Sequence, residues 1–225
     1  MCFSASASFV AGSVLTSIGV ASVKKVNTKE HYLFASIPII FGIQQIAEGF
    51  IWLGLNDAEN GSYLQIATYL FIFIAQVIWP IWVPLSILFL NKKNRRKSLQ
   101  KILVILGAGL SMYMCYCLYW FHIEAKIIDH HIAYYQAYPI SNKYYVIVSY
   151  GLATILPALI SQIKNMWVLG LSLLLSYLIT AIFYQSFTLS VWCFFAAVIS
   201  IFVYLITLHL RKPLETHVSR RFAVN

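Results

Sequence analysis

Glu48 is the residue of this sequence best placed to do chemistry, because it is a carboxylic acid inside an apolar run. Residues 42–55 read GIQQIAEGFIWLGL. On a helix, Gln45, Glu48 and Trp52 fall at i, i+3 and i+7 and so form one stripe. A carboxylate there can ligate a metal, act as a general acid or base, or carry a proton. The alternative is a hydrogen-bonded acid that only fixes its helix to a neighbour.

Cysteine and histidine supply the second set of reactive side chains. Cys2 and Cys193 are expected at the same end of the molecule, where they form a disulfide, act as soft metal ligands or simply pack between helices. His130 and His131 follow Asp129 in the longest connection between apolar segments, and histidine binds metals or moves protons near neutral pH. These two cysteines and two histidines are the candidate ligands for a transition metal such as zinc, although a solvated histidine pair fits the sequence too.

The composition determines where these residues must be held. The chain has 225 residues, of which 60% are hydrophobic and 10% charged, so a soluble domain would lack the polar surface to cover it. Seven apolar segments are long enough, at about 20 residues, to cross a bilayer as helices. The sequence therefore predicts one all-α domain over residues 1–225, a seven-transmembrane-helix bundle with spans near residues 5–23, 32–54, 63–90, 101–122, 145–162, 166–185 and 189–210.

Basic residues predict the orientation of this bundle. All 16 Lys and Arg residues except Lys126 and Lys143 fall on one side of the predicted spans, and basic residues are retained in the cytoplasm during insertion. The N-terminus is then outside, and residues 211–225 form a cytoplasmic tail. The net charge of +9 is explained by these basic residues on the cytoplasmic side, where they set the orientation and attract anionic membrane lipids. We therefore expect no nucleic-acid partner.

The predicted spans bring polar residues together in the outer half of the membrane. Gln76 and Trp79 lie three residues apart in the third span, which Pro80 and Pro84 can kink. The connection 123–145 is external and too apolar for a free linker, so we expect it to cap the mouth of the bundle. The result is an outward-facing pocket lined by Gln45, Glu48, Trp52, Gln76, Trp79 and Trp192.

Four segments resemble a known family. The start MCFSASASFVAG, the segment FGIQQIAEGFIWL, the run WPIWVPL and the segment FTLSVWCFFAAVIS resemble an uncharacterised family of bacterial integral membrane proteins, a domain of unknown function whose members begin Met-Cys-aromatic-Ser. The resemblance implies a topology and no activity. The positions that it matches are Cys2, Ser4, Gln45, Glu48, Trp52, Trp82, Pro84, Trp192 and Cys193, with a looser match of His130 or His131 and Tyr134.

Three classes of function fit these observations. The first is a binding or sensing protein of the bacterial inner (cytoplasmic) membrane, in which a small molecule, lipid or metal occupies the outer pocket. The second is a membrane-embedded metal-dependent hydrolase or thiol redox protein that uses Glu48, Cys2, Cys193 and a loop histidine. The third is a carrier for a small solute or for protons, although the sequence shows no internal repeat.

Overall fold

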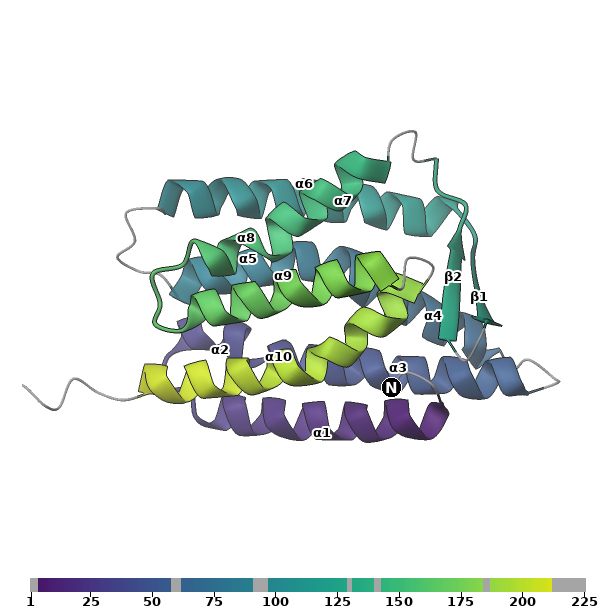
Figure 1. Cartoon of the computed structure of the whole chain (residues 1–225), viewed down its shortest axis with the longest axis horizontal. Helices are drawn as coiled ribbons and strands as arrows, with labels where there is room; N and C mark the ends of the chain where they lie inside the picture. The colour runs from purple at the N-terminus through teal and green to yellow at the C-terminus, as the bar shows by residue number, and fades with distance from the viewer. Residues whose placement is uncertain are drawn as a thin grey trace, which may run out of the picture.

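The computed structural model is almost entirely helical, and its helices run along one long axis (Figure 1). It describes residues 4–57, 62–90, 97–128, 131–139, 143–183 and 187–211, apart from the side chains of residues 143, 144, 193, 194, 196–198 and 211. A β-hairpin lies across one end of the bundle (Figure 1). The helix connections alternate between the hairpin end and the opposite end.

Within these residues, five helical stretches are long and apolar enough to cross a membrane. They are Ala5–Lys24, Lys29–Asn56, Tyr63–Leu90, Lys97–Trp120 and Met166–Phe183, which are α1, α2 with α3, α4 to α5, α6 and α9. These match the first four and the sixth predicted spans. The fifth and seventh predicted spans contain α7 (Lys143–Thr154), α8 (Leu156–Leu159) and α10 (Thr188–Arg211), whose crossing of a membrane stays a prediction.

Proline accounts for two of the helix breaks. The second predicted span is divided into α2 (Lys29–Ala35) and α3 (Ile37–Asn56), with Pro38 in the first turn of α3. Pro157 occupies the same position in α8, after the break at Ile155. Proline has no N–H to continue a preceding helix but is well suited to begin a new one. Each span is therefore interrupted at one residue and then continues as a new helix.

The third span contains a π-helical segment, η1 (Ile74–Ile78), between α4 (Tyr63–Phe73) and α5 (Trp79–Leu90). The Trp79 N–H bonds the Ile74 carbonyl, in the i→i−5 pattern of a π-helix. The next such bond would need an N–H at Pro80, which has none. The Tyr150 hydroxyl donates to the resulting free carbonyl of Ala75 at 2.6 Å. A π-turn, which contains one more residue than an α-turn, thus lies directly before the prolines at which the sequence predicts a kink.

Glycines allow α1 and α3 to pack closely side by side. Gly12 lies against Gly42 and Ile46, and Gly49 lies against the ring of Phe9. A Cβ atom at these glycines would come within about 3 Å of the opposite helix. Small residues at such contacts are typical of helices that pack within membranes. This contact fixes the height of α1 relative to the stripe that carries Glu48.

The predicted loop cap is a two-stranded antiparallel hairpin, β1 (Ile123–Ile128) and β2 (His131–Gln136), with Ile127 opposite Ile132. The alternation of buried and exposed residues in β1 is that of a strand with one buried face. The hairpin packs on the ends of α3 and α4 in a cluster that includes Trp52 and Phe71. Tyr134 stacks on Phe71 with ring centroids 4.9 Å apart.

Candidate functional site

Glu48 lies at the contact between α3 and the start of α10. Its side chain is completely buried. Gln45 Nε2 donates to Glu48 Oε2 at 3.0 Å, and Ser190 Oγ donates to Glu48 Oε1 at 2.8 Å. Ser190 is in the first turn of α10, where the helix dipole favours a negative charge. Each oxygen of the Glu48 side chain therefore has a hydrogen-bond donor, one from its own helix and one from α10.

The rest of the predicted stripe is buried in the same region. Gln45 and Trp52 are 2% and 4% exposed. Ser8, on the facing side of α1, is fully buried. Trp52 Nε1 and Ser8 Oγ have no hydrogen-bond partner among the described residues, and leaving such a group unpaired costs about 1–3 kcal/mol. The surroundings of Glu48 thus contain two buried polar groups to which the described residues offer no hydrogen-bond partner.

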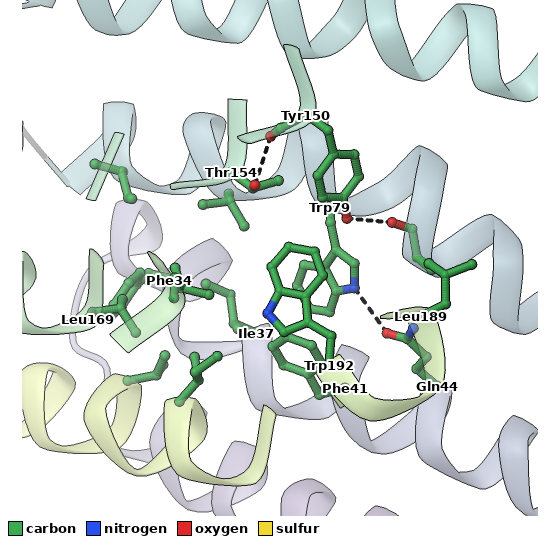
Figure 2. Close-up of a pocket in the computed structure, with 16 residues that line it drawn as sticks. Phe34, Ile37, Phe41, Gln44, Trp79, Tyr150, Thr154, Leu169, Leu189 and Trp192 are labelled. Atoms are coloured by element: carbon green, nitrogen blue, oxygen red, sulfur yellow. Dashed lines mark hydrogen bonds between the residues drawn. The ribbon is translucent and has the colours of Figure 1, made fainter. Parts of the chain in front are cut away.

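A cavity lies beside this cluster, between α2, α3, η1, α5, α7, α9 and α10 (Figure 2). Its volume is about 60 Å³. On α10 its lining extends from Leu189 to Val203, which is about 20 Å at the rise of an α-helix. The cavity is therefore long and narrow. Its lining residues are Phe34, Ile37, Phe41, Gln44, Ala75, Trp79, Val83, Ile87, Tyr150, Thr154, Leu169, Leu173, Leu189, Trp192, Ile199 and Val203.

The polar atoms of the lining gather towards one end of the cavity. Trp79, Trp192 and Tyr150 lie together near Gln44 and Leu189 (Figure 2). Trp79 Nε1 donates to Gln44 Oε1 at 3.0 Å, and Trp192 Nε1 donates to Ser176 Oγ at 3.0 Å. The Tyr150 hydroxyl donates to the carbonyl of Ala75 in the π-helical segment. These polar groups hold the walls in place, and the remaining lining is mostly apolar.

The cavity and the Glu48 cluster share two walls. Gln44 lines the cavity while its neighbour Gln45 bonds Glu48, and Leu189 lines the cavity while its neighbour Ser190 bonds Glu48. Successive residues of a helix point in directions about 100° apart, so each pair serves both sides. A change in the position of α10 relative to α3 would alter both sites.

Gln76 lies elsewhere, although the sequence placed it in the same pocket. Its Nε2 donates to Gln136 Oε1 at 3.0 Å, and the Tyr138 hydroxyl donates to its Oε1 at 3.2 Å. Both partners belong to the hairpin region. Gln76 and Trp79 diverge because the π-turn between them contains more residues than an α-turn. Burial raises the pKa of the Tyr138 hydroxyl above its ordinary value of 10.0, so the hydroxyl stays protonated as a donor.

The predicted metal ligands are described only in part. Cys2, His130 and the side chain of Cys193 lie outside the described residues. His131 is described, and its ring stacks on Phe187 with centroids 4.7 Å apart. Within the described part of the chain, no three His, Cys, Asp or Glu side chains are grouped so that they could hold a metal ion. The metal site therefore stays a prediction.

A comparison with protein families matches residues 1–218 to a family of unknown function, DUF6629. The chain belongs to this family. The match confirms the expected membership of a family without a known function. The bacterial origin and the Met-Cys-aromatic-Ser start stay predictions. No curated protein and no solved structure matches the chain, so DUF6629 supplies no activity against which to compare the site.

Sequence reasoning missed several residues of these sites in the DUF6629 chain. Ser190 and Ser8 were missed because serine is common in apolar helices and carries no spacing signal. Tyr150 had a usable signal, since a proline within a span leaves a carbonyl that a hydroxyl from another helix can satisfy. Pro80 therefore points to a donor opposite it, although the sequence does not say on which helix.

Proposed function

We propose that the protein is a seven-span membrane protein whose cavity binds a single slender hydrocarbon chain, in a binding or sensing role. The observation that carries the proposal is the shape and lining of the cavity, which is about 60 Å³ in volume and lined mainly by apolar side chains. Hydrocarbon chains are the most abundant ligands that such a site meets in a bilayer. In this proposal the hairpin end is external, and the membrane is the bacterial cytoplasmic membrane.

The volume of the cavity favours a chain over a ring. A cavity of about 150 Å³ is known to admit benzene, and this cavity has less than half of that volume. An aromatic ring or a sterol would have to displace several buried side chains. A flexible single chain can follow the long axis of the cavity while the lining moves only slightly. The ligand class is therefore a lipid or fatty compound that inserts one tail.

Two variants of α10 test this proposal. Ile199 lines the cavity, whereas Ile201 is 51% exposed on the same helix. Ile199→Trp fills the cavity, and Ile201→Trp makes the same change outside it. The full chain is purified in detergent, and bound lipids are measured by native mass spectrometry. We expect a bound chain in the original protein and in Ile201→Trp, and at least about tenfold weaker retention in Ile199→Trp, equal to about 1.4 kcal/mol.

Two results would contradict the proposal. One is a purified protein that carries no hydrocarbon compound and whose melting temperature does not respond to added fatty acids or alcohols. The other is equal retention by both tryptophan variants. Comparison of their melting temperatures shows whether Ile199→Trp is still folded, so loss of the fold is not mistaken for loss of binding.

A carrier is the second candidate, and the π-helical segment favours it. η1 and its two following prolines lie beside the cavity, to which Ala75 and Trp79 contribute. Interrupted helices next to a central site are typical of transporters. Release of a loaded fatty acid from proteoliposomes, faster than from liposomes without protein, would support this candidate. Equal release rates from proteoliposomes and from protein-free liposomes would contradict the carrier and be consistent with a protein that binds the ligand without transporting it.

The metal-dependent hydrolase and the thiol redox protein remain alternatives from the sequence. They depend on Cys2, Cys193 and His130, with Glu48 as the acid. Elemental analysis of the purified protein tests the metal alternative, since zinc bound near one atom per chain and lost in Cys2→Ser would support it.

A further inference from the structure

We propose that Ser8, Glu48 and Trp52 form a second binding site, separate from the cavity, which takes a hydroxyl group. The hydroxyl belongs to a water molecule or to an alcohol. The site does not depend on the hydrocarbon ligand proposed above. It rests on three buried polar side chains from two helices and on the hydrogen-bonding capacity of each.

The packing of α1 on α3 brings these residues to one level. Phe9 lies against Gly49, and Gly12 lies one turn further along α1, against Ile46. Ser8 is therefore at the height of the turn that carries Glu48. Ser8 is buried on the same stripe of α1 as Gly12, the stripe that faces α3.

Trp52 adds a donor to this level from α3. It lies four residues after Glu48, on the same face of the helix. Ala5, one turn before Ser8, packs against the apolar cluster that contains Trp52 and Leu189. The start of α1, the end of α3 and the first turn of α10 therefore converge here. Ser190 holds the carboxylate from the α10 side.

The unsatisfied atoms define the chemistry of the ligand. Trp52 Nε1 can only donate, and it has no acceptor among the described residues. A metal ion or an ammonium group has no lone pair to offer it. Ser8 Oγ, which is also without a partner in the described chain, can donate or accept. Glu48, when ionised, can only accept. A hydroxyl group both accepts from the indole and donates to a carboxylate, so it satisfies all of these groups.

The burial of the site limits the size of this ligand. Ser8, Glu48 and Trp52 are 0%, 0% and 4% exposed. A ligand that reaches all three must place little more than one oxygen atom among them. Water meets this condition directly, and an alcohol meets it if its carbon chain leaves between the helices. Buried waters of this kind bind to two to four polar groups.

Removal of the indole donor gives the first test. Trp52→Phe removes the N–H and also leaves a gap in a buried site, so the melting temperature of the purified full-length protein is compared with that of a second buried variant. Trp79→Phe is the matched control, because Trp79 is 5% exposed and its Nε1 donates to Gln44 Oε1 at 3.0 Å. If Trp52 Nε1 binds a hydroxyl, both variants lose ring volume together with a hydrogen bond, and we expect similar falls in melting temperature. If Trp52 Nε1 is unpaired, Trp52→Phe should lower the melting temperature clearly less than Trp79→Phe does.

Spectroscopy then identifies the hydroxyl, independently of stability. In ultraviolet resonance Raman spectra, the difference between the original protein and Trp52→Phe isolates the indole N–H of Trp52. We expect the frequency of a hydrogen-bonded indole. Infrared spectra in H₂¹⁸O then show a shifted buried-water band, absent in Trp52→Phe, if the hydroxyl is water. If the indole bond instead disappears on delipidation without an isotope shift, the hydroxyl belongs to an alcohol.

An indole N–H with the frequency of an unbonded group would overturn the proposal, as would a Trp52→Phe variant clearly more stable than Trp79→Phe. The first of these results does not depend on the cavity. Ile199→Trp, which fills the cavity, should leave the Trp52 signal unchanged, so the failure of one proposal is distinguishable from the failure of the other.

Discussion

The carboxylate of Glu48 connects a neighbour on its own helix to a residue that lies 142 positions further along the chain. It accepts hydrogen bonds from Gln45 on its own helix and from Ser190 on α10, and it lies at a helix N-terminus that favours negative charge. The acid is therefore a structural link between α3 and α10 as well as the candidate reactive group. A substitution that removes this carboxylate is therefore expected to lower the stability of the fold, whatever its effect on an activity.

Glu48→Gln should lower the free energy of unfolding by about 1–3 kcal/mol. The new amide places an NH₂ group where the carboxylate accepted a bond, opposite either the Gln45 amide or the Ser190 hydroxyl. Glu124→Gln is the control, because Glu124 is 53% exposed in β1 and its carboxylate forms a surface ion pair with Lys126. Chemical denaturation in detergent measures both variants. Equal stability of the two would show that the hydrogen bonds at Glu48 contribute little.

Tyr138 predicts a response to alkaline pH. Its folded pKa is raised above the ordinary value of 10.0, chiefly by burial. Stability from the neutral hydroxyl is therefore present below about pH 10 and is lost as the pH rises above it. Tyr138→Phe should make the melting temperature less sensitive to pH between about 9 and 11. Tyr145→Phe, at a side chain that is 75% exposed, should keep the original sensitivity.

The sequence predicted part of the residue-level site. The stripe of Gln45, Glu48 and Trp52 follows from helical periodicity, because α3 is a regular helix over this range. Gln76 did not join it, since periodicity cannot be carried across a π-turn that the sequence does not reveal. Ser190 could not be found, because no spacing rule relates residues on two helices separated by more than 100 positions.

Among the helices and strands, the contact between α5 and α6 depends on a single glycine. Pro84 lacks the N–H that would bond the Pro80 carbonyl, and Gly107 of α6 lies directly against this carbonyl oxygen. Gly107→Ala should therefore destabilise the protein by about 1–3 kcal/mol, because the new methyl group would overlap the backbone of α5. Thermal unfolding in detergent measures the change.

The control for this variant is on the same helix. Outside the backbone of its own helix, a Cβ atom at Gly109 would meet no heavy atom of the described residues within 4 Å. Gly109→Ala should be neutral or raise stability by up to about 1 kcal/mol through helix propensity. Equal melting temperatures for Gly107→Ala and Gly109→Ala would show that α6 does not approach the Pro80 carbonyl this closely.

The π-helical segment gives a second prediction about an element. Tyr150 and Ser111 donate to the carbonyls of Ala75 and Val77, at 2.6 and 2.7 Å. Tyr150→Phe should cost about 0.5–1.5 kcal/mol for the lost hydrogen bond, and it should also speed amide hydrogen exchange in η1 over that in α4. Exchange measured by mass spectrometry tests this. Tyr177→Phe on α9 removes a hydroxyl from another helix and should leave the exchange of η1 unchanged.

The helices were easier to predict than the hairpin for a physical reason. Apolar segments of about 20 residues give a strong signal, and α1, α3 and α6 agree with the predicted spans to within a few residues. The hairpin is short, and its strand signal is the alternation in Ile123–Ile128. Its apolar content was recognised as evidence of burial, but the alternation was not used to predict strands.

For the molecule as a whole, most of the described basic residues near the helix ends lie opposite the hairpin. Lys24, Lys29, Lys97, Lys164 and Arg211 border helix ends opposite the hairpin (Figure 1). The exceptions are Lys126, which lies in the hairpin itself, and Lys143, at which α7 begins. This distribution supports an orientation with the hairpin outside, which stays a proposal until it is measured in cells.

Labelling of single cysteines measures this orientation. In a background in which the four natural cysteines are replaced by serine, Lys126→Cys should react with a membrane-impermeant maleimide in intact cells. Lys101→Cys, at the opposite end of the bundle, should react only after the membrane is made permeable. The reverse pattern would show that the hairpin faces the cytoplasm and that the basic end is outside.

The glycine contact between α1 and α3 has a consequence for how the protein can move. Gly12 and Gly42 bring the two backbones so near that sliding one past the other would drive a Cβ-bearing neighbour into the opposite main chain. The two helices are therefore expected to move as one rigid unit. The residues that line the cavity include six from α9 and α10 and none from α1. We therefore expect that α9 and α10 move relative to the α1–α3 pair when the cavity opens to admit a ligand.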